Sequence, residues 1–152
     1  MQGSLVPAKP AVDYVANAAS GDMLEIQTSQ LALERSRNAP VRAFAEQMTK
    51  DHPSLSQALM TAARNSGVTP PPPALTARHA DMLKMLGATA PAQFDAAYIK
   101  LQVAAHEEAL ALHRAYAASG DNTSLKSAAA SAVPVVQGHL QHVQALNAHS
   151  GR

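Results

Sequence analysis

The chain of 152 residues contains no cysteine. Disulfides, thiolate nucleophiles and cysteine-ligated metals are therefore excluded, although a chain without cysteine suits a reducing and an oxidising compartment equally well. Aromatic residues make up only 3% of the sequence, and alanine supplies much of the 47% hydrophobic share. Alanine is the strongest helix former, and no segment shows the alternation of Val, Ile and Thr that is typical of strands. The composition predicts an all-α protein with enough residues for one domain and a core.

The sequence also has no marked excess of charge of either sign and no long apolar run. The formal net charge is +1, and the Lys and Arg residues are scattered. Without a basic cluster or aromatic stacking residues, the sequence offers no sign of nucleic-acid binding. No apolar run approaches the ~20 residues that cross a bilayer, which predicts no transmembrane segment. The opening residues, MQGSLVPAKP, lack the basic start and apolar centre of a secretory signal, so we expect no signal peptide in this chain.

Turn and helix-stop residues divide the chain into four long segments. The breaks are the NAP sequence at 38–40, Gly67 and Gly120, which are typical helix ends and starts. A flexible lead-in is expected at 1–11 and a helical domain at 12–149. We expect the long helices at about 12–36, 40–66, 91–119 and 122–148, with kinks at the internal prolines 53 and 134.

The second and third long helices are joined by an extended link between Gly67 and Pro91. The link contains four consecutive prolines at 70–73, which cannot be helical, and a short helix is expected at about 75–86. Such a link is long enough to run along a helix pair, as in bundles with one long crossover. The sequence therefore predicts an up-down four-helix bundle with a long link between helices two and three.

Histidine interrupts an otherwise apolar stripe on three of the four long segments. A buried polar group is costly unless it has a partner, so three such interruptions call for an explanation. The stripes are Val41, Ala45, Met48, His52, Leu55 and Leu59 on the second helix, Ile99, Val103, His106, Leu110 and His113 on the third, and Leu125, Ala129, Ala132, Val136, His139, Val143 and Leu146 on the fourth.

The first helix contributes a long acidic side chain, Glu25, on a stripe of small residues. This stripe lies about 100° from the centre of the larger apolar stripe of the same helix. If helices one and four run one way and helices two and three the other, Glu25, His52, His106 and His139 share one axial level to within ~1.5 Å of rise. The four side chains are therefore expected to meet at the middle of the bundle.

One carboxylate and three imidazoles would suit a divalent transition metal such as zinc or iron. The alternative is a metal-free stress or interaction module, in which each core histidine is satisfied by a backbone carbonyl or a glutamine and serves as a pH-sensitive group. Gln102, one turn before His106, is a candidate partner of this kind. No catalytic grouping is recognisable, so no catalytic residue is assigned. A homo-oligomer is compatible with the sequence, which indicates no particular protein partner.

The remaining charged and histidine positions are interpreted as structural or solvated. His113 and His142 are candidates to lie behind the metal ligands, whereas His79 falls on the short link helix and His149 on the tail. Asp51 points about 100° away from His52 around the helix, so we expect it to be a solvated charge. Glu107 and Glu108 are interpreted as part of a solvated helix face.

Four stretches together resemble the family called domain of unknown function 4142, over about residues 12–147. They are AASGDMLEIQTSQLAL, VRAFAEQMTKDH, FDAAYIKLQVAAHEEALALH and AVPVVQGHLQHVQAL. The resemblance implies a ferritin-like helical bundle and a periplasmic or secreted location in bacteria. The recurrent Glu of the family matches Glu25, the His of its Met-x-x-Asp-His motif matches His52, and its later His positions match His106 and His139.

The resemblance also bears on the kind of metal site. Ferritin-like di-iron sites pair carboxylates with Glu-x-x-His motifs. Helices two and four lack that motif, and helix four has His139-x-x-His142 in its place. A mononuclear, histidine-rich site is therefore the expectation.

Overall fold

The computed structural model describes residues 10–150, and residues 1–9 of the expected lead-in lie outside the described part. The described chain is helical throughout apart from its connections, and it contains no strand, which confirms the all-α prediction. The elements are α1 (Pro10–Arg35), α2 (Ala39–Asn65), α3 (Ala77–Gly87), the short 3-10 helix η2 (Pro91–Gln93), α4 (Phe94–Ser119) and α5 (Thr123–Ser150).

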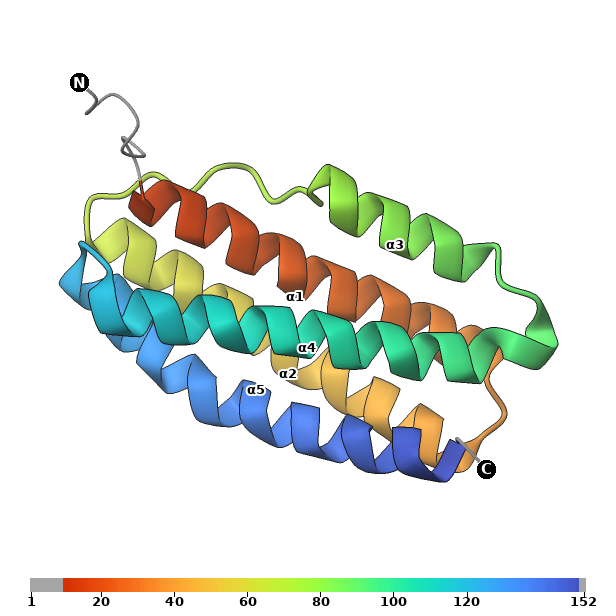
Figure 1. The fold of residues 1–152 in the computed structure, drawn as a ribbon. Coiled ribbons are helices and arrows are strands. Elements are labelled where there is room, and N and C mark those ends of the chain that lie inside the picture. Colours follow the sequence, from red (N-terminus) through yellow and green to blue (C-terminus); the bar gives the residue numbers. More distant parts are fainter. Residues whose placement is uncertain (1–9, 151–152) are drawn as a thin grey trace, which may run out of the picture.

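The four long helices form a closed ring in which each packs against two others. The packed pairs are α1 with α2, α2 with α5, α5 with α4, and α4 with α1. Figure 1 shows that α1 and α5 run in one direction and that α2 and α4 run in the other. The predicted bundle packing is therefore confirmed, whereas the ferritin-like topology stays a prediction.

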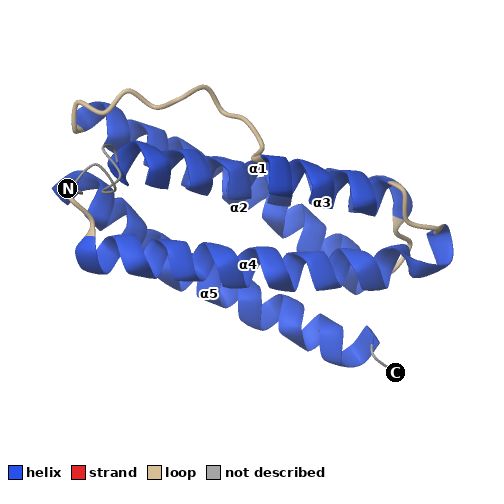
Figure 2. Ribbon diagram, turned by 45° about the horizontal axis from the view of Figure 1, so that its top comes forward, coloured by secondary structure: helices blue, strands red, loops and turns tan. Residues whose placement is uncertain are grey.

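The link between α2 and α4 runs along the outside of the bundle. Figure 2 shows it leaving α2 as an extended loop that leads into α3. The short helix α3 packs on α1 and α4. The link thus carries the chain from one end of the bundle to the other, as its length predicted (Figure 1).

Side-chain caps explain why the helices begin where they do. The Oδ1 atom of Asn38 accepts a hydrogen bond from the backbone N–H of Val41 at the start of α2 (3.0 Å). The Oγ1 atom of Thr76 does the same for the N–H of His79 at the start of α3 (3.2 Å). Each cap satisfies one of the backbone donors that a helix leaves free in its first turn. After α2, Gly67 adopts φ +75°, a conformation that favours glycine.

Two helices contain an internal proline. Pro53 lies within α2 and Pro134 within α5, and both helices continue on either side. Each proline removes one backbone donor from the helix. The kinks expected at the two positions stay predictions.

The apolar core divides into two clusters, one toward each end of the bundle, and the polar residues at the middle of α1, α2 and α4 lie between them. The first cluster includes Phe44, Met48, Tyr98, Ile99, Val136 and Val143. The second includes Tyr14, Val15, Leu59, Tyr116, Leu125 and Ala129.

The small-residue face of α1 is the face that packs into the bundle. Ala18, Ser29 and Ala32 are buried. Of the larger apolar stripe, Val15 and Ala19 are buried, whereas Val12, Met23, Ile26 and Leu33 are only partly buried. Small side chains allow neighbouring helices to approach closely, which leaves room for one long polar group. That group is Glu25, whose side chain is 1% exposed.

Candidate metal centre

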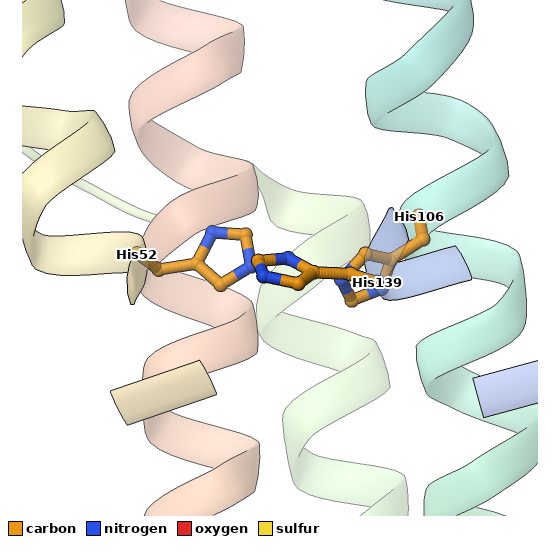
Figure 3. A group of neighbouring side chains, drawn as sticks. All are labelled: His52, His106 and His139. Carbon is orange, nitrogen blue, oxygen red and sulfur yellow. The ribbon is translucent and has the colours of Figure 1, made fainter. Parts of the chain in front are cut away.

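Three histidines from three helices meet at mid-height in the bundle. His52 comes from α2, His106 from α4 and His139 from α5, and Figure 3 shows their rings at one level. All three are buried, and their ring centroids lie 5.2–5.6 Å apart. One ligand atom from each ring lies within 4.8 Å of the others, so the group could hold a metal ion.

Each of these rings uses one nitrogen to donate a hydrogen bond to an oxygen atom at its periphery. Two of the acceptors are carboxylates and the third is a backbone carbonyl in the same helix. The bonds run from His52 Nδ1 to Asp22 Oδ1 (2.8 Å), from His106 Nδ1 to Gln102 O (2.7 Å) and from His139 Nε2 to Asp51 Oδ2 (2.8 Å).

The second nitrogen of every ring lacks a hydrogen-bond partner among residues 10–150. These atoms are His52 Nε2, His106 Nε2 and His139 Nδ1, and all are buried. An unpaired buried polar atom costs about 1–3 kcal/mol, so three in one place are expensive. A histidine that binds a metal almost always donates its other ring N–H to a carboxylate or a backbone carbonyl. The hydrogen-bond pattern therefore fits three metal-binding imidazoles.

Glu25 lies next to His52 and His106, but at the Nδ1 edge of each ring rather than at the edge with the unpaired nitrogen. Its Oε1 atom is 3.2 Å from His52 Nδ1, and its Oε2 atom is 3.1 Å from His106 Nδ1. The unpaired nitrogens of both rings are the Nε2 atoms. Glu25 thus forms a second buried group with Asp22 and His52, which could also hold a metal ion. Its predicted role as a ligand alongside the three imidazoles stays a prediction.

The electrostatics of the site favour neutral imidazoles at His106 and His139. Burial and the neighbouring His52 lower the pKa of His106 to about 3. Burial also lowers the pKa of His139, although the hydrogen bond to Asp51 acts in the opposite direction. Both rings therefore offer a nitrogen lone pair at neutral pH, which metal binding requires.

His52 differs because it faces two carboxylates. Burial alone would lower its pKa, but Glu25 and the hydrogen bond to Asp22 raise the pKa to about 9. Burial raises the pKa of Glu25 to about 7, against the attraction of His52. In the metal-free protein His52 is therefore protonated at neutral pH, and a metal must displace that proton.

Two acidic residues of the site were not identified from the sequence. Asp22 precedes Glu25 by three residues, a spacing that places both on one face of α1, so this pair was a readable signal. The interpretation of Asp51 as a solvated charge is wrong, because its side chain is only 30% exposed and accepts the bond from His139. The helix α5 packs on α2, which brings His139 within hydrogen-bond distance of the Asp51 carboxylate.

His79 and Glu108 hold the short helix α3 to the bundle. His79 is buried, with Nδ1 2.5 Å from Ser20 Oγ and Nε2 2.6 Å from Glu108 Oε1. Glu108 also pairs with Arg78. Glu108 is exposed, which agrees with the expected solvated face, and its carboxylate also links α4 to α3. His79 is structural, as expected.

The other histidines bond away from the three-histidine group. His113 Nδ1 lies 2.7 Å from the hydroxyl of Tyr14, and His142 Nδ1 lies 3.1 Å from Gln47 Oε1. Gln102, the candidate partner of His106, accepts the hydrogen bond of His106 Nδ1 with its backbone carbonyl oxygen, in the same helix. The side chain of His149 lies outside the described part. None of the helices within residues 10–150 is long and apolar enough to span a membrane.

The fold and the site define a class of protein: an all-α bundle with buried histidine and carboxylate groups that could hold a metal ion. Residues 3–146 match the domain of unknown function DUF4142, and the chain belongs to that family. This match confirms the resemblance seen in the sequence motifs. No curated protein matches the chain.

A solved structure shares the fold. The crystal structure of a DUF305 fragment from Deinococcus radiodurans superposes with a TM-score of 0.78, covering 92% of this chain and 96% of the fragment. The two sequences are 16% identical, so the similarity concerns the fold alone.

Proposed function

We propose that this protein binds a divalent transition metal, zinc or iron, between His52, His106 and His139, with Glu25 as the carboxylate of the site. One observation supports the proposal above all others. Each of the three rings is fixed at one nitrogen by an oxygen acceptor, and each has its other nitrogen buried and unpaired within the described chain.

The donor set suits these two metals. Imidazole nitrogens bind zinc and iron, and a nearby carboxylate offsets part of the positive charge that enters a buried site. Glu25 reaches an ion among the three rings only if its carboxylate leaves the Nδ1 edges of His52 and His106. From its present position the Glu25 carboxylate would stabilise the bound ion by its negative charge, through the ring of His52, without contacting the ion.

The metal-free alternative explains the site less well. A core histidine in a structural role has its polar atoms satisfied. Here one nitrogen on each of three adjacent rings has no partner among the described residues. A shared cation is the simplest partner for all three at once.

Metal titration of matched histidine variants tests the proposal. The purified protein is stripped with a chelator and titrated with Zn²⁺, or with Fe²⁺ without oxygen, and bound metal is measured by calorimetry and elemental analysis. We expect the wild type to bind stoichiometrically and His52→Ala to lose this binding. His142→Ala is the control, since His142 lies on the same helix as His139, one turn on, but is exposed and bonds to Gln47.

Two results would contradict the proposal. A wild-type protein that binds neither metal after reconstitution leaves the unpaired nitrogens without their proposed partner. Equal binding by the wild type and His52→Ala would mean that the metal is held elsewhere.

We also propose a periplasmic or secreted location, on the basis of the family resemblance alone. Cell fractionation of the native host with an antibody against the protein tests this location. Recovery in the cytoplasmic fraction alone would refute it.

A further inference from the structure

His52 is the one residue shared by the two buried groups that could hold a metal ion in the described chain. Its Nε2 atom is the unpaired nitrogen, on the ring edge away from the carboxylates. Its Nδ1 atom faces Asp22 Oδ1 at 2.8 Å and Glu25 Oε1 at 3.2 Å. The two edges of one imidazole therefore belong to two different sets of donors.

The spacing on the carboxylate side suits a shared cation. Nitrogen and oxygen ligands lie ~2.1 Å from zinc, so two ligands at right angles or somewhat wider are ~3.0–3.4 Å apart. The nitrogen–oxygen distances of 2.8 and 3.2 Å are close to that range.

Two further observations point to a ligand at this position. Glu25 is 1% exposed, and its Oε2 atom, 3.1 Å from His106 Nδ1, has no hydrogen-bond partner in the described part of the chain. In addition, a cavity of about 380 Å³ lies between α1, α3 and α4, and Asp22, Glu25 and His52 all line it. The cavity is also lined by exposed residues, among them Arg78 and Glu108, so it extends from the carboxylates toward the protein surface.

We infer that His52 is shared by two divalent cations, the first bound through Nε2 together with His106 and His139, and the second through Nδ1 together with Asp22 and Glu25. This inference rests on the proposed function, with Glu25 in its present position, where it acts on the first ion by charge and binds the second ion directly. The second ion is of the class that accepts mixed nitrogen and carboxylate ligands, such as zinc or iron(II).

The binding step balances in protons and charge. The second ion takes the Nδ1 lone pair of His52 after the Nδ1 proton has left for bulk solvent. The ring, already bound through Nε2, then becomes an anion between two dications. The carboxylates of Asp22 and Glu25 offset further positive charge, which a buried site requires.

Counting bound ions in two matched carboxylate variants tests the inference. Zn²⁺ is the probe, and its stoichiometry is measured by titration and by elemental analysis after gel filtration. Asp22→Asn removes a carboxylate behind His52 but keeps an oxygen that can accept the Nδ1 hydrogen bond. Asp51→Asn makes the same change behind His139, where no second group of donors exists among the described residues.

We expect two ions in the wild type, two in Asp51→Asn and one in Asp22→Asn. If Asp22→Asn fails to fold, as judged by its helical circular dichroism, Glu25→Gln takes its place with the same expected loss of one ion. With Co²⁺ as the probe, the doubly loaded wild type should show magnetic coupling through the shared ring in electron paramagnetic resonance. Two uncoupled ions would overturn the sharing of His52.

The stoichiometries separate this inference from the proposed function. One ion in both the wild type and Asp22→Asn, lost in His106→Leu, would overturn the shared pair and leave the three-histidine site intact. One ion that is lost in Asp22→Asn but kept in His106→Leu would instead overturn the three-histidine site. No bound ion in the wild type would refute both.

Discussion

Replacement of His106 by leucine offers a sharp measure of what a bound metal contributes to stability. His106 is fully buried and packs against Phe44, and the pKa lowered by burial means that no charge is lost. Leucine is apolar and of similar size, so His106→Leu removes one imidazole ligand without opening a large cavity. The backbone carbonyl of Gln102 loses only a side-chain donor.

The expected effect follows from linkage between folding and binding. A ligand that binds only the folded state adds about 2.7 kcal/mol at 100 times its Kd and about 4.1 kcal/mol at 1,000 times. An unfolding entropy of ~2.1 cal/mol/K per residue amounts to about 0.3 kcal/mol per degree for this chain of 152 residues. Zinc bound at the three-histidine site should therefore raise the melting temperature by about 8–13 °C.

The assay is differential scanning calorimetry of each variant with and without Zn²⁺. The shift within each variant is compared, so any effect of the substitution on the metal-free protein cancels. We expect the shift to fall in His106→Leu, which loses the three-histidine ion, and to persist in full in His142→Leu. A full shift in His106→Leu would refute the three-histidine site, and so would the absence of a shift in a wild type that is known to bind zinc.

Three further predictions concern pH, the link and the glycines. His52 has a pKa of about 9 in the folded protein, above its ordinary 6.5, so the stability that its protonation adds is complete below pH 6.5 and is lost as pH rises toward 9. The melting temperature of the metal-free protein should therefore fall progressively over that window. A flat profile would contradict the pairing of His52 with its two carboxylates. Apart from cuts at the termini, limited proteolysis with a non-specific protease should cut first at residues 68–76, because this segment lacks helical structure. Earlier cuts inside α2 or α4 would argue against the helix bounds. A Cβ atom at Gly120 would lie 2.6 Å from the ring and from the carbonyl oxygen of Tyr116, so Gly120→Ala should lower the free energy of unfolding by about 1–3 kcal/mol in chemical denaturation. Gly138 lies in a helix with open space around it, so Gly138→Ala should raise the free energy of unfolding by about 0.5–1 kcal/mol. Equal stability of the two variants would contradict the close contact at Gly120.

The helices and the axial level of the histidines could be predicted from the sequence because both depend on local rules. Alanine-rich segments favour helix wherever they lie, and turn residues such as Asn38 and Gly67 mark the ends. The rise per residue then fixes the height of each side chain along its own helix. Counting residues from the helix ends was therefore enough to predict that His52, His106 and His139 lie at one level.

The tertiary structure alone decided which edge of each ring faces which neighbour. That choice depends on the rotation of each helix about its axis and on the side-chain rotamers, and both are set by packing against other helices. For this reason Glu25 lies against the Nδ1 edges of two rings, and Asp51 accepts a hydrogen bond from His139 on another helix. The position of α3 was likewise beyond local rules, since contacts of His79 with α1 and α4 hold a helix whose own sequence specifies no partner.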